Sequence, residues 1–442
     1  MSIDHTAQDK PVVAGAVITL LSSASALRQA YRKTETTGLI EALGSQTAFV
    51  ESFSIRKPNP ARLFGQGQID QIADWIDQHG CELLIVDGEL SPIQQRNLER
   101  ALNIKVIDRT GLILEIFGLR AKSKAGRLQV ETARLAYERS RLVRTWTHLE
   151  RQRGGQGVMS GPGETQIEAD RRMIDDKLQR LKSQLRDVER TRRVQRSGRA
   201  ARDVPIVSLV GYTNAGKSTL FNRLTDADVF AQNMPFATLD PTIRYFDVGI
   251  GGEVALVDTV GFITDLPTTL IEAFKATLEE AVLSDLILHV HDSASDEVFD
   301  QAAEVERILD DLEELVDEDL PPIIHVWNKV DLLSDDELAA LEHGQKEQDA
   351  AFVSATTGKG IPDLVQRIKS GLTRNTRLFD IRLESSLGQA RSWLYAHGDV
   401  MSEEDTESGS EVVVKVRLDR KALGQFQQFF NDKHITIIKS SG

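Results

Sequence analysis

The chain has 442 residues, of which 40% are apolar and 27% are charged, a composition typical of a globular protein of about three domains. Its single cysteine, Cys81, excludes an internal disulfide, and a net charge of −14 taken alone argues against nucleic acid as a partner. No apolar run approaches the ~20 residues that a transmembrane helix needs. We therefore expect a cytoplasmic protein without a membrane span.

The charge is unevenly distributed along the sequence. Residues 120–202 contain 22 Lys and Arg against 10 Asp and Glu, a net charge of +12, so the rest of the chain carries −26. One strongly basic segment within an acidic protein indicates that a polyanion, such as nucleic acid, meets that segment alone.

Residues 1–112 are expected to form a small α/β domain with a mostly parallel sheet, because short apolar runs alternate with amphipathic segments. Ser91 and Pro92 predict the start of one helix, since a capping hydroxyl is followed by a proline at the first turn. The expected strands are 12–20, 48–55, 83–86 and 104–107, and the expected helices are 26–43, 69–78 and 91–102.

The basic segment falls in residues 113–202, which we expect to form an antiparallel helical hairpin and its linker. Leucines recur every seven residues from Leu128 to Leu149, and a second apolar seam runs through 174–188 with spacings of 4, 3, 4 and 3. Between the seams, residues 151–164 hold five glycines and a proline, which predict a flexible tip. Residues 190–202 are expected to be a polar, Arg-rich linker. A solvated two-helix brace with a disordered turn is the alternative interpretation.

The central motif is a phosphate-binding loop that follows the apolar run 206–210 and precedes a helix-like segment at 219–224. Its glycines let backbone N–H groups wrap a polyphosphate, and the helix presents the positive end of its dipole. Lys217 is expected to reach the outer phosphates, and the Ser218 hydroxyl to ligate Mg²⁺. A plain glycine turn is the less favoured alternative. The loop residues are Gly211, Tyr212, Thr213, Asn214, Ala215, Gly216, Lys217 and Ser218.

Residues 203–373 contain further segments that turn a phosphate binder into a guanine-nucleotide switch. Asp258 follows an apolar strand, so its carboxylate can hold Mg²⁺ through water, and the Gly261 N–H can contact a γ-phosphate. Thr238 is our candidate for a second Mg²⁺ ligand that is ordered only with the triphosphate, and Thr242 is its rival. The intervening residues Thr259 and Val260 belong to the same expected nucleotide site.

Recognition of the base is expected at the ends of two later strands. The Asp331 carboxylate can accept hydrogen bonds from N1–H and the exocyclic amine of guanine, a pair of donors that adenine lacks. The segment 354–356 can add a backbone N–H to the guanine carbonyl. These motifs, each at a strand end and in this order, predict a GTPase. The residues involved are Asn328, Lys329, Val330, Asp331, Ser354, Ala355 and Thr356.

Two remaining parts suggest no chemistry. His289 and His291 lie at the end of an expected strand, where structural histidines with satisfied hydrogen bonds are favoured over ligands or bases. Residues 374–442 are expected to be a small α+β appendage. Its expected elements are a helix at 387–395, a polar loop at 402–410, a strand at 412–418, a helix from 420 and a strand at 435–438.

The motifs and the tip sequence from Gly161 to Glu164 resemble the HflX family of translation-associated GTPases. The resemblance implies GTP hydrolysis coupled to binding of the large ribosomal subunit, with the helical part reaching rRNA and splitting stalled or idle ribosomes. A GTP-gated rRNA-binding factor in ribosome assembly is the alternative from a different class. We expect a monomer. The resemblance also covers a switch made of Phe236, Ala237, Thr238, Leu239 and Asp240.

Catalysis is expected to rest on transition-state support from Lys217, Thr238 and Gly261, with no general base assigned. Phe262 stands where Ras-like proteins carry the glutamine that orients the attacking water, so slow intrinsic hydrolysis is expected. Asn214 matches a position at which similar GTPases hold K⁺, which makes K⁺ a candidate cofactor beside Mg²⁺. The residues expected to contact RNA at the hairpin tip are Arg153, Gly154, Gly155, Gln156, Gly161 and Gly163.

Overall fold

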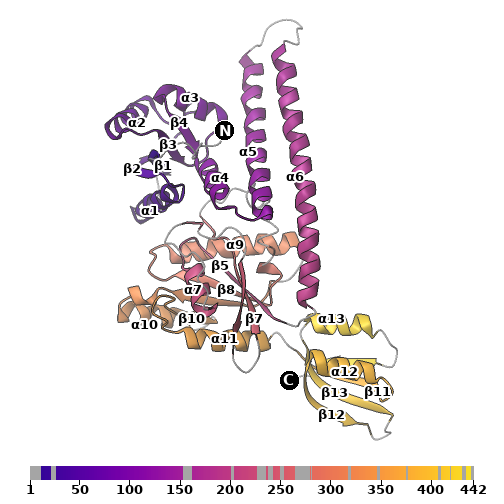
Figure 1. The fold of residues 1–442 in the computed structure, drawn as a ribbon. Helices are drawn as coiled ribbons and strands as arrows, with labels where there is room; N and C mark the ends of the chain where they lie inside the picture. Colours follow the sequence, from indigo (N-terminus) through magenta and orange to yellow (C-terminus); the bar gives the residue numbers. More distant parts are fainter. Residues whose placement is uncertain are drawn as a thin grey trace.

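A computed structural model gives the structure of the protein, which is drawn in Figure 1. Its described part contains three sheets, of four, six and four strands, and a long pair of helices. The expected mixed α/β fold is therefore confirmed. The described residues are 11–20, 26–152, 162–200, 204–225, 235–236, 242–248, 253–263, 279, 281–316, 320–345, 349–374, 377–406, 410–418, 420–430 and 435–439.

The N-terminal part is the expected parallel sheet, and helices pack on both of its faces. The strand order is β2-β1-β3-β4, with α1 and α4 packed in one apolar core and α2 and α3 in another. The Ser91 side chain accepts a hydrogen bond from the Gln94 N–H and so caps α3. The elements are β1 (Val13–Leu20), α1 (Ala26–Ala42), β2 (Gln46–Ser54), α2 (Gln66–His79), β3 (Leu83–Asp87), α3 (Pro92–Leu102), β4 (Lys105–Asp108) and α4 (Arg109–Arg120).

The expected helical hairpin is formed by α5 (Lys124–Gln152) and α6 (Pro162–Ala200), which lie side by side and project from the rest of the molecule (Figure 1). Buried leucines from both helices form the seam between them. Two ion pairs join the helices across this seam, Lys177–Glu131 at 2.7 Å and Arg139–Asp175 at 2.5 Å.

Among the described residues, no helix is long and apolar enough to cross a membrane.

Three expected boundaries of the hairpin are wrong. The expected start at residue 113 falls within α4, whose apolar side chains pack in the N-terminal core. The helix α6 continues to Ala200, so residues 190–200 are helical rather than a linker. Arginine and glutamine are good helix formers, and the single Gly198 does not offset them. Gly163 lies in the first turn of α6 rather than in the connection, because Pro162 is preorganised for a first helical position. The expected tip residues from Arg153 to Gly161 lie outside the described residues.

The six-stranded sheet has the order β10-β9-β8-β5-β7-β6 and is parallel except for β6, which runs antiparallel to β7. The carboxyl ends of its parallel strands meet at one edge, where ligands bind in open α/β sheets. The elements are β5 (Ile206–Gly211), α7 (Lys217–Thr225), β6 (Thr242–Asp247), β7 (Glu253–Asp258), β8 (Leu286–Asp292), α9 (Val298–Val316), β9 (Ile323–Asn328), η1 (Val330–Leu332), α10 (Asp335–Gly344), β10 (Ala350–Phe352) and α11 (Ile361–Arg374).

The C-terminal appendage is an antiparallel sheet of order β12-β13-β11-β14 with two helices packed on it. The expected loop at 402–410 is wrong in part, because β12 extends to Asp405. This edge strand is rich in polar residues, and its pairing with β13 stabilises it where local propensity does not. The elements are β11 (Arg377–Glu384), α12 (Gly388–His397), β12 (Asp399–Asp405), β13 (Glu411–Leu418), α13 (Arg420–Phe429) and β14 (Ile435–Lys439).

The N-terminal part packs against the segments that flank the phosphate-binding loop. Phe236 is only 2% exposed, and its ring meets that of Phe117 edge-on with centroids 4.6 Å apart. Val260 and Ile263 belong to the same apolar cluster as α1 and α4. The segments expected to form the switch are therefore partly buried in the N-terminal core.

Candidate nucleotide site

The phosphate-binding loop connects β5 to α7 at the carboxyl edge of the six-stranded sheet. Gly211 has a φ of 145°, and a Cβ there would lie 2.2 Å from the Val290 carbonyl oxygen. Gly216 has a φ of 90°, and a Cβ there would lie 2.2 Å from Asn328 Nδ2. Both positions therefore require glycine for the loop to approach the neighbouring strands.

Lys217 is buried at the first position of α7, with its ammonium inside the loop. Its Nζ donates to the carbonyl oxygens of Gly211 at 2.9 Å and Tyr212 at 2.7 Å. Burial lowers the pKa of Lys217 to about 8, although the Asp258 carboxylate opposes this shift. A cation already removed from water interacts more strongly with a phosphate than an exposed one does.

Ser218 and Asp258 bring two oxygen donors together beside this lysine. Ser218 Oγ donates to Asp258 Oδ2 over 2.8 Å, and Asp258 is fully buried at the end of β7. A hydroxyl and a carboxylate are hard oxygen donors, so this pair fits Mg²⁺. Thr238 lies outside the described residues. Its rival, Thr242, begins β6 and pairs with Asp258 in the antiparallel register.

The segment after β7 lies directly on the loop. The Thr213 N–H donates to the Phe262 carbonyl oxygen at 2.6 Å, and the Phe262 N–H donates to the Gly211 carbonyl oxygen at 3.1 Å. A Cβ on Gly261 would lie 2.9 Å from the Thr213 side chain and 3.0 Å from Lys217 Nζ, so this approach favours glycine. The Phe262 ring is buried in the apolar cluster beneath α9. It therefore presents no hydrogen-bonding group to an attacking water.

The other described switch residues face the core. Thr259 Oγ1 donates to the Leu209 carbonyl oxygen at 2.6 Å, and the side chains of Val260 and Phe236 are buried in the N-terminal cluster. These side chains fix the position of the switch backbone. The further expected switch residues Ala237, Leu239 and Asp240 lie outside the described residues.

Asn328 joins three segments of the expected base-binding edge. Its Nδ2 donates to the Ala215 carbonyl oxygen at 2.9 Å, and its Oδ1 accepts from the Ala355 N–H at 3.0 Å. Lys329 has a φ of 65°, and its ammonium lies 2.6 Å from the Asp292 carboxylate. The phosphate-binding loop, the end of β9 and the loop after β10 are thereby tied into one edge.

The expected guanine-reading residue, Asp331, is exposed in the turn η1, beside the buried Val330. Ser354 is fully buried, while Arg223 of α7 donates to the carbonyl oxygens of Ala355 and Thr356. The structure thus brings the phosphate-binding loop, Asp258 and both expected base-binding segments to the same edge of the sheet.

The sequence analysis missed a buried charged network that reaches the loop from the N-terminal part. Tyr212 Oη donates to Glu35 Oε1 at 2.6 Å, so the loop is hydrogen-bonded to α1. Arg109 pairs with Glu35 at 2.8 Å and with Asp87 at 2.7 Å. Burial opposes the charge of Arg109, but the two carboxylates outweigh it and raise its pKa. The sequence does contain one signal for this network, because the carboxylate of Asp87 stands at the end of an apolar strand. Its partners could not be found in this way, because Glu35 and Arg109 lie on helices that are distant in sequence.

Comparison with known proteins covers nearly the whole chain. The matching family models are described as GTP-binding GTPase N-terminal (residues 30–118), GTP-binding GTPase Middle Region (120–199), 50S ribosome-binding GTPase (206–329) and HflX C-terminal domain (339–428). A GTPase HflX from Magnetococcus marinus is 45% identical over 386 residues, which are 87% of this chain and 87% of that protein. The chain belongs to the HflX family of GTPases.

A second protein named GTPase HflX gives the same result. GTPase HflX from Escherichia coli is 44% identical over 380 residues, which are 86% of this chain and 88% of that protein. A solved GTP-binding protein from Sulfolobus solfataricus, in complex with GDP, is 24% identical, with a TM-score of 0.45, and the match covers 82% of this chain and 99% of that one. The expected family is confirmed, and with it the assignment of the protein as a GTP hydrolase.

Proposed function

We propose that this HflX-family GTPase binds the large ribosomal subunit and uses GTP to dissociate stalled or idle ribosomes. It would act as a monomer in the cytoplasm. The observation that carries the proposal is the connection of a long basic hairpin to the nucleotide site, since α6 ends at Ala200 and β5 begins at Ile206. The match of residues 206–329 to a family described as a 50S ribosome-binding GTPase supports it.

In the nucleotide site, the backbone N–H groups of residues 211–218 would surround the phosphates, and Lys217 would neutralise the outer ones. Ser218 would hold Mg²⁺ directly and Asp258 through water, with Thr238 as the ligand added when the triphosphate is bound. When bound, Mg²⁺ supplies charge neutralisation at the β- and γ-phosphate oxygens. The Gly261 N–H would hold the γ-phosphate, so loss of that group would release the switch.

The base would lie at the other side of this edge. Asp331, exposed in η1, would accept two hydrogen bonds from guanine, while the backbone after β10 would donate one to its carbonyl. Asn328 supports this arrangement because it already joins the phosphate-binding loop to Ala355. The buried Phe262 ring supports slow intrinsic hydrolysis, which binding to the ribosome would accelerate.

The hairpin would supply the contact with rRNA. Its net charge of +12 between residues 120 and 202 attracts phosphates, and the glycine-rich connection can fit an irregular RNA surface. The proposed contact residues are Arg153, Gly154, Gly155, Gln156, Gly161 and Gly163.

Light scattering from assembled ribosomes tests this function. Scattering is expected to fall when the protein and GTP are added together, and to stay unchanged with GDP. The variant Lys217→Ala serves as a control, because it should bind GTP poorly and leave the ribosomes intact. If scattering stays constant with GTP while the protein associates stably with ribosomal precursors, the chain is an assembly factor and the proposal is wrong.

A further inference from the structure

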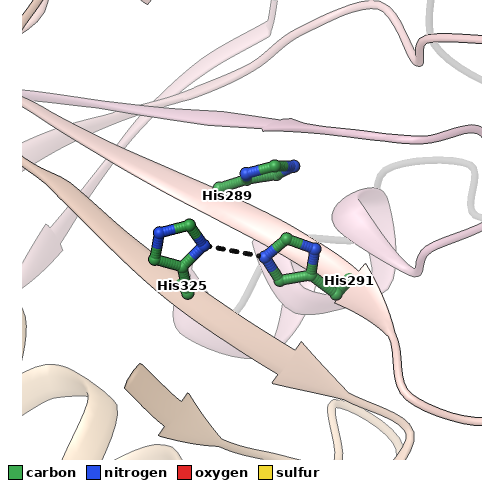
Figure 2. Close-up of side chains that lie close together, drawn as sticks. All are labelled: His289, His291 and His325. Carbon is green, nitrogen blue, oxygen red and sulfur yellow. Dashed lines mark hydrogen bonds between the residues drawn. The ribbon is translucent and has the colours of Figure 1, made fainter. Parts of the chain in front are cut away.

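Outside the nucleotide contacts, three histidines converge on one face of the six-stranded sheet (Figure 2). His289 and His291 are two residues apart on β8, so their side chains share a face. His325 on β9 pairs directly with His289 in the parallel register and faces the same way. One ring nitrogen from each residue can be chosen such that all three lie within 4.8 Å of one another.

The hydrogen bonding of this cluster is incomplete. His291 Nε2 and His325 Nδ1 are 3.1 Å apart and share one hydrogen bond. His289 is only 1% exposed, yet its Nδ1 has no hydrogen-bond partner among the described residues. A buried polar atom without a hydrogen-bond partner is unfavourable, because its lost interaction with water is not replaced. The expectation that His289 is a fully satisfied structural histidine is therefore wrong.

We propose that His289, His291 and His325 form a binding site for a transition-metal ion, and that Zn²⁺ is the ion it takes. Neutral imidazole nitrogens are preferred ligands of Zn²⁺, whereas Mg²⁺ prefers oxygen. Zinc bonds of about 2.0 Å in a tetrahedron place the ligand nitrogens about 3.3 Å apart. His291 and His325 have nearly this spacing, at 3.1 Å, and the His289 nitrogen lies within 4.8 Å of both, so an inward shift of at most about 1.5 Å brings it to the tetrahedral spacing.

The surroundings of the cluster favour a metal ion over simple packing. The Trp327 ring stacks on His291 with centroids 4.5 Å apart, which fixes the orientation of that imidazole. Burial, and then the neighbouring imidazoles, lower the pKa of His289 and His291, to about 3 for His291. His325 is only partly buried, so solvent can reach this side of the cluster, from which a water would complete the four-coordinate sphere of Zn²⁺.

The position of the site indicates a structural role for the ion. His289 pairs with Val210, the residue before Gly211, and Trp327 directly precedes Asn328. An ion held by β8 and β9 would therefore fix β9, from which the base-binding segment begins, and β8, which pairs directly with the strand β5 that leads into the phosphate-binding loop. The expected effect is greater thermal stability. This inference does not depend on the ribosomal function proposed above.

Metal titration of the full-length, untagged protein tests the site. The protein is first treated with a chelator and then saturated with GDP and Mg²⁺, so that added metal does not enter the nucleotide site. Zn²⁺ is then titrated in competition with a chromophoric chelator, and Co²⁺ is added separately as a spectroscopic probe. We expect one Zn²⁺ per chain, a rise in the melting temperature, and visible Co²⁺ bands of the intensity typical of four-coordinate sites.

The variant His325→Asn identifies the ligands, because this residue is partly exposed and its change should not prevent folding. Zinc affinity is expected to fall by about 100-fold or more, since even supporting partners of a ligand contribute about 10–100-fold. His343→Asn is the matched control, because His343 is exposed on α10 and should not affect the affinity. Unchanged GDP binding verifies the fold of both variants. Absence of zinc binding, or equal affinity in the two variants, would overturn the proposal.

Discussion

Asp331 is the residue on which base selection is expected to depend, and its carboxylate is exposed at the nucleotide edge. The change Asp331→Asn should weaken GTP binding by about 2–3 kcal/mol. One of the two carboxylate oxygens that would accept a hydrogen bond from guanine becomes an NH₂ group, which faces a donor on the base. The same change should favour xanthine nucleotides, whose second carbonyl accepts that donor. Calorimetry with both nucleotides measures the effect. Asp335→Asn, also exposed, is the control, and an unchanged GTP affinity in Asp331→Asn would remove this residue from the site.

A second prediction at this scale concerns Asn214, which has a φ of 63° and an exposed side chain in the phosphate-binding loop. Its amide oxygen is free to turn toward the phosphates and hold K⁺, whose charge would stabilise the transferring phosphoryl group. GTP hydrolysis should therefore be faster in K⁺ than in Na⁺ at equal ionic strength. Asn214→Ala should remove the difference. Equal wild-type rates in the two salts would contradict the hypothesis.

The residues that could be predicted from sequence are those that follow one another in short motifs. The loop with Lys217 and Ser218 is such a case, because the chemistry of phosphate binding fixes both residue types and spacing. The hydrogen bond from Tyr212 to Glu35 joins residues 177 positions apart, and no local pattern encodes it. His325 was missed for the same reason, since only the pairing of β9 with β8 brings it to His289.

Among the elements, the connection between α5 and α6 is expected to contact the large ribosomal subunit and to be needed for stimulation of GTP hydrolysis. Replacing residues 154–161 with a short Gly-Ser turn leaves Pro162 and the first turn of α6 in place. GTP affinity and basal hydrolysis should stay nearly unchanged, whereas stimulation by large subunits should fall sharply. Residual binding should depend more steeply on salt, because diffuse phosphate contacts would dominate.

Turnover measured with and without large subunits decides this prediction. The basal rate of the shortened variant is the internal control, since it reports on the integrity of the nucleotide site. Full stimulation of that variant would mean that the connection is a passive turn and that another surface contacts the ribosome.

Element types were predicted better than element boundaries. The leucine seam identified both helices of the hairpin, because a seven-residue period is a strong signal for one apolar face. The end of α6 and the strand β12 were missed, since both have polar sequences. Helix propagation extends α6 through its polar C-terminal part, and pairing with β13 stabilises β12 as a strand. Neither effect leaves a periodic apolar pattern.

At the scale of the whole molecule, Phe117 is expected to couple the N-terminal part to the switch. Phe117→Ala should destabilise the protein by about 3–5 kcal/mol and free the Phe236 ring, which packs edge-on against it. Amide hydrogen exchange in residues 242–263 should then become faster. Phe64→Ala is the matched control, because Phe64 is equally buried but belongs to the other N-terminal core. Equal exchange in the two variants would show that Phe117 has no specific effect on the switch.

The length of α6 determines how far one end of this helix moves when the other end rotates. Its 39 residues span about 58 Å at about 1.5 Å per residue. A tilt of about 10° at Ala200 would carry the far end through about 10 Å, by the geometry of a rod of that length. In the reverse direction, a displacement of several ångströms imposed at the far end reaches β5 as a rotation of a few degrees. The hairpin therefore has the geometry of a lever arm, in which small rotations beside the nucleotide site correspond to large displacements at the far end of α6.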